Sequence, residues 1–362
     1  MKSSSLAVPL LLGSLWAVST FAQNPDPLDI RACTAIVSDA MRLACYDHAT
    51  HRDLSDPQKD ADTKIRTKGV FSQVHADALT EATASEAAPP PSRSLLNSRW
   101  ELTPESKLGT FNLRSFQPVY VMPVFATSKQ NNEPSSPNPN NSASTPQHLD
   151  NIEAKFQLSL KAKIWQGVFG DVGDLWMGYT QSSRWQLYNT RESRPFRESD
   201  YEPEAMLMFA TNYHAFGWDG RLLGIGIDHQ SNGRSDPYSR SWNRIVANVG
   251  FERENWTVML RPWWRLPESR GDDNNPDIEN YMGRGEMQVV HLWNAQEFGL
   301  TLRHSLRGGD DSHGSARFSW SFPLSGNLRG YIEAFSGYGE SLIDYNHNAT
   351  YVGAGVSLLD WY

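Results

Sequence analysis

The residue types best suited to covalent chemistry lie near the middle of the chain, at His229 and Ser231. Both continue the apolar side of an alternating segment, 222–231, whose earlier members on that side are Leu223, Ile225 and Ile227. Successive residues on one face of a strand are about 6–7 Å apart, so the two side chains can lean into contact. A hydroxyl beside an imidazole is a nucleophile with its general base, the pair that acyl transfer needs.

An orienting residue for the imidazole is available on the next segment. A hairpin centred near Pro237 sets His229 opposite Asn243. The same register sets Ser231 opposite Ser241. Serine, histidine and an amide then form one cluster with the roles of nucleophile, base and orienter.

The loop at 232–240 supplies two further kinds of group. Gly233 permits close approach of the backbone, so its N–H could bind an oxyanion. Asp236, Ser239 and exposed carbonyls are hard oxygen ligands of the kind that calcium takes. The acidic loop 271–277 could also hold a cation, although most such loops are solvated turns.

These groups need a scaffold of strands, and much of the chain after residue 110 has a period of two. Apolar and polar residues alternate over segments of about ten residues or more, which is longer than the usual strand. The clearest segments are 155–164, 256–266, 298–307, 316–324 and 350–362. We count about twelve such segments between 111 and 362, with short links alternating with longer polar loops.

Alternation alone also fits a soluble sandwich. The long segments, the signs of export and the aromatic residue that closes the last strand favour an all-β fold, a twelve-stranded antiparallel transmembrane β-barrel over 99–362. In such a barrel the apolar phase faces lipid, so a polar residue in that phase needs a reason. His229 and Ser231 could instead lie above the membrane, where outward polar groups cost nothing. Three complementary residues across one hairpin favour catalysis.

Export is indicated by residues 1–22. A basic start, a short apolar stretch and small residues before a cleavage site after Ala22 are typical of a secretory signal peptide. An anchored helix would need a longer apolar run. We expect short periplasmic helices over 23–53 and a linker over 54–98, because the latter is polar and rich in Ala, Ser and Pro.

The chain has two cysteines, Cys33 and Cys45, and export places them in an oxidising compartment. A straight helix would separate them by about 18 Å. A disulfide needs Cα atoms within about 7 Å. If the two cysteines pair, the segment must fold back on itself as a small helical hairpin.

Gln181 is a polar residue among the outward apolar residues of 175–187. It could face a second copy of the chain in a dimer, or it could meet water at the membrane interface, and the phase leaves both open. The stretch 129–147 is rich in Asn, Ser and Pro, so we expect a mobile loop there.

The composition excludes several classes of function. The net charge of −8 and the lack of a basic cluster argue against a nucleic-acid partner. The sequence has no zinc-type His/Cys spacing, no phosphate loop and no G-x-S-x-G elbow. The 13 Trp and 13 Tyr suit the aromatic girdles of a membrane barrel.

Several longer motifs extend the cluster. His-Gln-Ser-Asn-Gly-Arg-Ser-Asp-Pro occupies 229–237, and Ser-Arg-Ser-Trp-Asn-Arg occupies 239–244. Tyr-Thr-Gln at 179–181, Asn-Pro-Asp-Ile at 275–278 and Ser-Gly-Tyr-Gly-Glu-Ser-Leu-Ile-Asp-Tyr at 336–345 accompany them. Together these motifs resemble the outer-membrane phospholipase A family of Gram-negative bacteria, over about 150–362.

The resemblance implies a twelve-stranded barrel that hydrolyses acyl esters of phospholipids at the outer membrane, with phospholipase A1, A2 and lysophospholipase activity. It implies Ser231 as the nucleophile, His229 as the base and Asn243 as the residue that orients His229. It also implies an oxyanion hole at Gly233, helped by calcium.

The resemblance further implies that calcium binds at the interface of a homodimer, which is the active state. The implied ligands are the Arg234 carbonyl, the Ser239 side chain and the partner subunit's Ser193. Gln181 would lie in the dimer interface. A further calcium position falls near Asp273, where this sequence has one extra residue, so that Asn274 stays an alternative.

Two other functions fit a barrel of this kind. A passive porin or structural barrel would conduct ions without lipolysis, although a lumen crowded with Arg, Glu and Trp favours a plugged barrel. An adhesin would use the polar loop 127–150 as its binding surface. The cluster and the resemblance favour the calcium-dependent phospholipase over both.

Overall fold

The computed structural model describes residues 33, 42, 45–46, 94–191 and 196–362, in two compact units, Met1–Thr67 and Lys68–Tyr362. In the first unit Cys33 and Cys45 form a disulfide, with their Cα atoms 5.6 Å apart. The chain therefore folds back between them, as expected for a pair. The expected signal peptide, most of the helical segment and the linker up to residue 93 lie outside the described residues.

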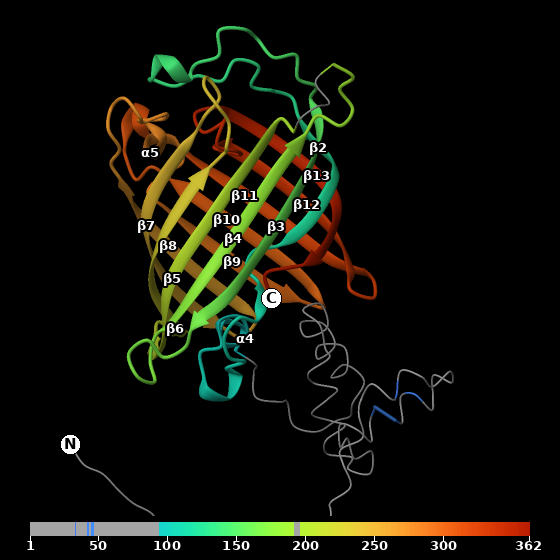
Figure 1. Ribbon diagram of the computed structural model, residues 1–362, viewed down its shortest axis with the longest axis vertical. Coiled ribbons are helices and arrows are strands. Elements are labelled where there is room, and N and C mark those ends of the chain that lie inside the picture. The colour runs from blue at the N-terminus through green and yellow to red at the C-terminus, as the bar shows by residue number, and fades with distance from the viewer. Residues whose placement is uncertain (1–32, 34–41, 43–44, 47–93, 192–195) are drawn as a thin grey trace, which may run out of the picture. The chain divides into compact units, whose positions relative to one another are not determined.

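The second unit is a closed antiparallel β-barrel (Figure 1). From β2 onward each strand pairs with its neighbours in the chain, and β13 pairs with β2 to close the ring. The strands are β1 (Leu113–Ser115), β2 (Val119–Thr127), β3 (Ile152–Trp165), β4 (Asp174–Trp185), β5 (Glu198–Ala215), β6 (Trp218–Ser231), β7 (Ser241–Arg253), β8 (Trp256–Leu266), β9 (Gly285–Trp293), β10 (Gln296–His304), β11 (Gly314–Ser325), β12 (Leu328–Tyr338) and β13 (Asn348–Leu359).

Twelve strand positions make up this ring within the described part of the chain. The short strand β1 pairs with β3, and so does β2 further along the same edge. β1 and β2 are therefore two pieces of one interrupted strand position, and the expected count of twelve is confirmed.

The side chains alternate between the outer face and the lumen as the sequence pattern predicts. On β6 the exposed fractions of Leu223, Ile225 and Ile227 are 48%, 52% and 62%, whereas Leu222 is fully buried. Apolar residues thus cover the outside and leave the interior to the opposite phase, which is the arrangement of a barrel in lipid.

Two short α-helices and three 3-10 helices among the described residues complete the unit. They are α4 (Leu95–Trp100), η3 (Pro104–Ser106), η4 (Pro139–Asn141), α5 (Ile278–Tyr281) and η5 (Gly309–Asp311). No helix among the described residues has the length and the apolar character needed to cross a membrane.

Helix α4 belongs to the barrel, although its first residues were expected in the linker that ends at residue 98. Leu96 and Trp100 are buried against lumenal side chains such as Trp176 and Met206. Glu252 of β7 accepts hydrogen bonds from the Ser94 hydroxyl (2.9 Å) and the Leu96 N–H (3.1 Å). The barrel unit therefore starts before residue 99, because the apolar face of α4 packs against lumenal side chains. The helix lies at one end of the barrel (Figure 1).

The last strand ends at Leu359, three residues earlier than the sequence pattern indicates. Glu297, a lumenal residue of β10, accepts hydrogen bonds from the N–H groups of Trp361 and Tyr362, both at 2.9 Å. Arg99 of α4 donates to the Trp361 carbonyl. These contacts draw the final residues away from the strand direction, and alternation alone could not reveal them.

Candidate active site

The β6–β7 hairpin brings the candidate residues together on the outer face. His229 pairs with Asn243 and Ser231 pairs with Ser241, the register expected from the sequence. His229 Nδ1 lies 2.8 Å from Asn243 Oδ1, within hydrogen-bond distance. Both side chains are half-buried, because they lie at the end of the apolar band formed by Leu223, Ile225 and Ile227. An imidazole held by an amide is thus in place beside a serine.

Ser231 lies two residues from His229 on the same face and is half-buried. Among the described residues, its hydroxyl forms no hydrogen bond with His229 or with any other group. A nucleophile and its base are often further apart without substrate than in the reacting complex. The hydroxyl is therefore available to a ligand that approaches from outside the barrel.

A residue that sequence reasoning missed extends the cluster. Glu268 Oε1 accepts a hydrogen bond from Asn243 Nδ2 at 3.1 Å. Burial is the largest cause that raises the pKa of Glu268, and the charge of Asp273 acts in the same direction. Arg265, the hydrogen bond from Asn243 and the charge of His229 lower that pKa. The register between β7 and β8 could have indicated this contact, because it sets Leu266, two residues before Glu268, opposite Asn243.

The loop at 232–240 is organised by the buried amide of Asn232, a second residue that was missed. Its Oδ1 accepts from the N–H groups of Arg240 (2.9 Å) and Arg234 (3.3 Å). Its Nδ2 donates to the Tyr238 carbonyl (2.8 Å) and to Glu198 Oε1 (2.9 Å). One side chain thus ties both sides of the loop to each other and to the adjacent strand.

Gly233 follows directly, and its backbone has φ +61°. That left-handed conformation is strained for residues with a Cβ. A Cβ at this position would also lie 3.2 Å from the ring of Tyr201, closer than ordinary contact. Glycine is therefore required here for two reasons, and the loop can turn immediately after the serine.

The implied calcium ligands lie in this loop and in the loop after β8. Ser239 Oγ accepts a hydrogen bond from Asn274 Nδ2 at 2.8 Å, so the two loops touch at this oxygen. Asp273 is buried and forms an ion pair with Arg265 at 2.7 Å. One of its two carboxylate oxygens therefore already has a partner. Ser193 lies outside the described residues.

The segment 128–150, which includes the expected mobile loop 129–147, packs over these loops through hydrogen bonds that a mobile loop would not form. The buried Asn141 donates from Nδ2 to Asp236 Oδ1 (2.7 Å) and to the Ser239 carbonyl (3.3 Å). Asn138 donates to the Asp273 carbonyl at 2.9 Å. A segment rich in asparagine resembles a disordered segment in composition. Here, however, the same amides form hydrogen bonds to loops that are distant in the sequence, and these loops lie at one end of the barrel (Figure 1).

Gln181 lies in the same row as the serine on the outer face. Gln181 of β4 pairs with Tyr201 of β5, which pairs with Ser231 of β6. Two strand spacings, about 10 Å, therefore separate Gln181 from the nucleophile position. The Gln181 amide accepts from the Tyr179 hydroxyl and donates to Ser183 Oγ, both at 3.2 Å. Its polar groups thus have partners within its own strand.

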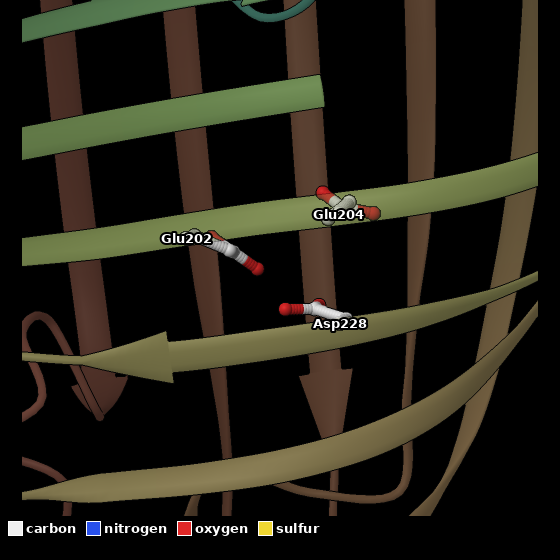
Figure 2. Close-up of side chains that lie close together, drawn as sticks. All are labelled: Glu202, Glu204 and Asp228. Atoms are coloured by element: carbon white, nitrogen blue, oxygen red, sulfur yellow. The ribbon is translucent and has the colours of Figure 1, made fainter. Parts of the chain in front are cut away.

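Three carboxylates, those of Glu202, Glu204 and Asp228, lie close together in the lumen. Glu202 and Asp228 point toward one another from neighbouring strands, with Glu204 beside them (Figure 2). Arg244 forms ion pairs with Asp228 (2.6 Å) and Glu202 (2.9 Å), and Arg261 forms one with Glu204. Because each of the three carboxylates forms an ion pair with one of these two guanidinium groups, the group is an ion-pair network in the lumen.

The fold and the site agree with comparisons to known proteins. A family model described as phospholipase A1 matches residues 96–358. A protein of Neisseria meningitidis serogroup B, named as a candidate phospholipase A1, is 35% identical over 381 aligned positions that cover 99% of this chain and 97% of that protein. The chain belongs to the phospholipase A1 family.

Members of this phospholipase family include proteins with solved structures. The phospholipase A1 of Escherichia coli K12 is 44% identical over 209 residues, which cover 58% of this chain and 70% of that protein. The Salmonella typhi outer-membrane phospholipase, solved as a dimer with bound calcium, is 39% identical with a TM-score of 0.62 and covers 70% of this chain and 94% of that one. The E. coli outer-membrane phospholipase A structure is 38% identical with a TM-score of 0.62, over 69% and 95% of the two chains.

This phospholipase A1 is therefore an enzyme with an outer-membrane β-barrel, and the expected fold class, enzyme class and location are confirmed. The passive porin or structural barrel is rejected by the family membership. The individual roles of His229, Ser231 and Asn243 stay predictions.

Proposed function

We propose that this phospholipase hydrolyses the acyl esters of phospholipids and lysophospholipids in a calcium-dependent reaction, with Ser231 as nucleophile, His229 as base and Asn243 as orienter. The observation that carries the proposal is the hydrogen bond of 2.8 Å between His229 Nδ1 and Asn243 Oδ1, with Ser231 two residues away on the same outward face. A polar cluster that faces the lipid side can receive an acyl chain directly from the membrane.

The reaction begins when His229 Nε2 takes the proton of Ser231 Oγ, which attacks the carbonyl carbon of the ester. The tetrahedral oxyanion receives a hydrogen bond from the Gly233 N–H. The C–O bond to the lysophospholipid then breaks, and His229 protonates the leaving alkoxide. Water, deprotonated by His229, releases the fatty acid from Ser231 by the same steps in reverse.

The residues of the 232–240 loop fit a calcium ion. The Arg234 carbonyl and the Ser239 hydroxyl are neutral oxygen donors, the type that calcium prefers. Among the described residues nothing donates a hydrogen bond to the Arg234 carbonyl, and Ser239 Oγ has an amide as its partner. Calcium, when bound, supplies positive charge near the oxyanion. The donor set of one chain is incomplete for an ion that takes six to eight oxygens.

A homodimer would complete that set, which is why we propose it as the active state. The Salmonella relative was solved as a dimer with bound calcium. In this chain Gln181 and Ser231 share one row of the outer face, so a second copy that covers Gln181 also covers the cluster. The partner subunit's Ser193 would then supply a ligand. The further calcium position near Asp273 is proposed in the same way, although its carboxylate already pairs with Arg265.

The proposal is tested with refolded protein in mixed phospholipid micelles, with calcium and with a chelator. Wild type should release fatty acid only with calcium. Ser231→Ala should lower that rate by at least about a thousandfold, because covalent catalysis is removed. Retained calcium-dependent release by Ser231→Ala would reject the assignment.

Ser235→Ala is the matched control, since it makes the same chemical change at an exposed serine of the following loop. It should keep the rate within about threefold of wild type, because surface changes without lost contacts have small effects. Folding of each variant is checked from the gel mobility of heated and unheated samples.

A further inference from the structure

Glu268 is a charged residue of the cluster to which the proposed reaction gives no role. Its Oε1 accepts from Asn243 Nδ2 at 3.1 Å, and Asn243 Oδ1 lies 2.8 Å from His229 Nδ1. The amide of Asn243 therefore bridges an imidazole and a carboxylate. Glu268 is half-buried, so its contact with the amide is partly shielded from water.

The local sequence explains why Glu268 reaches this place. β8 ends at Leu266, which lies opposite Asn243. The next residue, Pro267, has no N–H and cannot continue the ladder. The chain leaves the sheet there, and the following side chain can return over the end of the neighbouring strand.

We propose that Glu268 is a positioning residue that fixes the orientation of the Asn243 amide and, through it, the proton of His229. The inference rests on the proposed function of the cluster. A carboxylate can only accept a hydrogen bond, so the NH₂ end of Asn243 must face Glu268. The oxygen end then faces His229 Nδ1, which donates, and Nε2 keeps the lone pair that takes the proton of Ser231.

Without Glu268 the amide can turn end for end. Its NH₂ group would then face His229 Nδ1, which would have to accept, and the ring proton would move to Nε2. With a proton already on Nε2, His229 could not accept the proton of Ser231. The wrong tautomer of the base lowers turnover strongly in serine hydrolases. Glu268 also places one negative charge behind the amide, where it favours the imidazolium that forms during attack.

The first experiment measures kcat and KM for fatty-acid release from mixed micelles at saturating calcium. Glu268→Ala should lower kcat about tenfold with KM unchanged, the loss expected for one hydrogen bond to a charged group. Glu268→Gln should lose less, because its carbonyl can still accept from Asn243. The control Asp310→Asn removes an equal charge from an exposed residue of another outer loop and should match wild type.

The second experiment repeats the change in an Asn243→Asp background. An aspartate has no amide to orient, and its charge would oppose that of Glu268. Glu268→Ala should therefore leave kcat unchanged or raise it relative to Asn243→Asp alone. A merely structural role for Glu268 predicts the same tenfold loss in both backgrounds, since independent effects add.

The outcomes separate this inference from the proposed function. If Ser231→Ala keeps its calcium-dependent activity, both fail. If the activity depends on Ser231 but Glu268→Ala has the kcat of wild type, or loses equally in both backgrounds, only the role of Glu268 is overturned. The mobility of unheated samples on gels shows for each variant that the barrel is folded.

Discussion

Two polar regions lie back to back on opposite faces of this barrel, and both include residues of β6 and β7. On the inner side, Arg244 of β7 forms ion pairs with Asp228 of β6 and Glu202 of β5. On the outer side, the residues next to them in sequence, Asn243 and His229, form the candidate catalytic pair. The alternation of a strand thus separates the two regions by one residue.

The two regions differ in how many of their polar groups form ion pairs or hydrogen bonds. The lumenal carboxylates and guanidinium groups are buried or half-buried and form ion pairs with one another, so they contribute to the fold. The outer row consists of His229, Ser231 and Asn243 on the outer face. Within this row the hydroxyl of Ser231 has no hydrogen-bond partner among the described residues. We infer that changes in the lumen alter stability and that changes in the outer row alter catalysis.

The largest expected effect on stability comes from breaking the lumenal network. Arg244→Met leaves the buried carboxylate of Asp228 and the half-buried carboxylate of Glu202 without their common partner, which should lower the free energy of unfolding by about 3–5 kcal/mol. The measurement is a urea titration of refolded protein in detergent. Ser231→Ala should change the same quantity by less than about 0.5 kcal/mol, as expected for a site without such contacts.

A double variant sharpens this test. Adding Asp228→Leu to Arg244→Met removes one of the unpaired charges and should recover part of the lost stability. Equal stability of wild type and Arg244→Met would contradict the separation of roles.

The next effect concerns the segment 128–150, which holds the loops beside the outer row. Asn141→Ala removes the amide that bonds to Asp236 and to the Ser239 carbonyl. The calcium concentration for half-maximal activity should rise about fivefold, corresponding to one hydrogen bond, because the ligand loop is less well positioned. Saturating calcium should restore the rate.

Asn140→Ala is the control for that change, because the side chain of this neighbouring residue is exposed and bonds to no other loop among the described residues. Equal calcium requirements for the two variants would show that the segment does not position the ligand loop.

The smallest effect is expected at Gln181. Its amide already has partners in Tyr179 and Ser183, so a second subunit gains little by offering others. Gln181→Ala should weaken the dimer about two- to threefold, as judged by cross-linking across a range of protein concentrations. Gln147→Ala, the same substitution in an outer loop, is the comparison. Unchanged dimer content in Gln181→Ala would remove this residue from the interface.

Much of the fold followed from the sequence because strand alternation is a local property. The segment 256–266 coincides with β8, and the outward phase of Leu223, Ile225 and Ile227 is as expected. The register between β6 and β7 was also predictable, since the hairpin joins neighbouring strands through one loop. Those two features were enough to place His229, Ser231 and Asn243 on one face.

Only the tertiary structure decided which groups from elsewhere reach that face. Glu268, Asn232 and Asn141 come from different loops, and their contacts depend on closure of the ring and not on any local period. For the same reason we expected the start of α4 in a linker and a mobile loop at 129–147. Local pattern determined which side of the sheet each residue faces, whereas distant hydrogen bonds determined what each candidate residue touches.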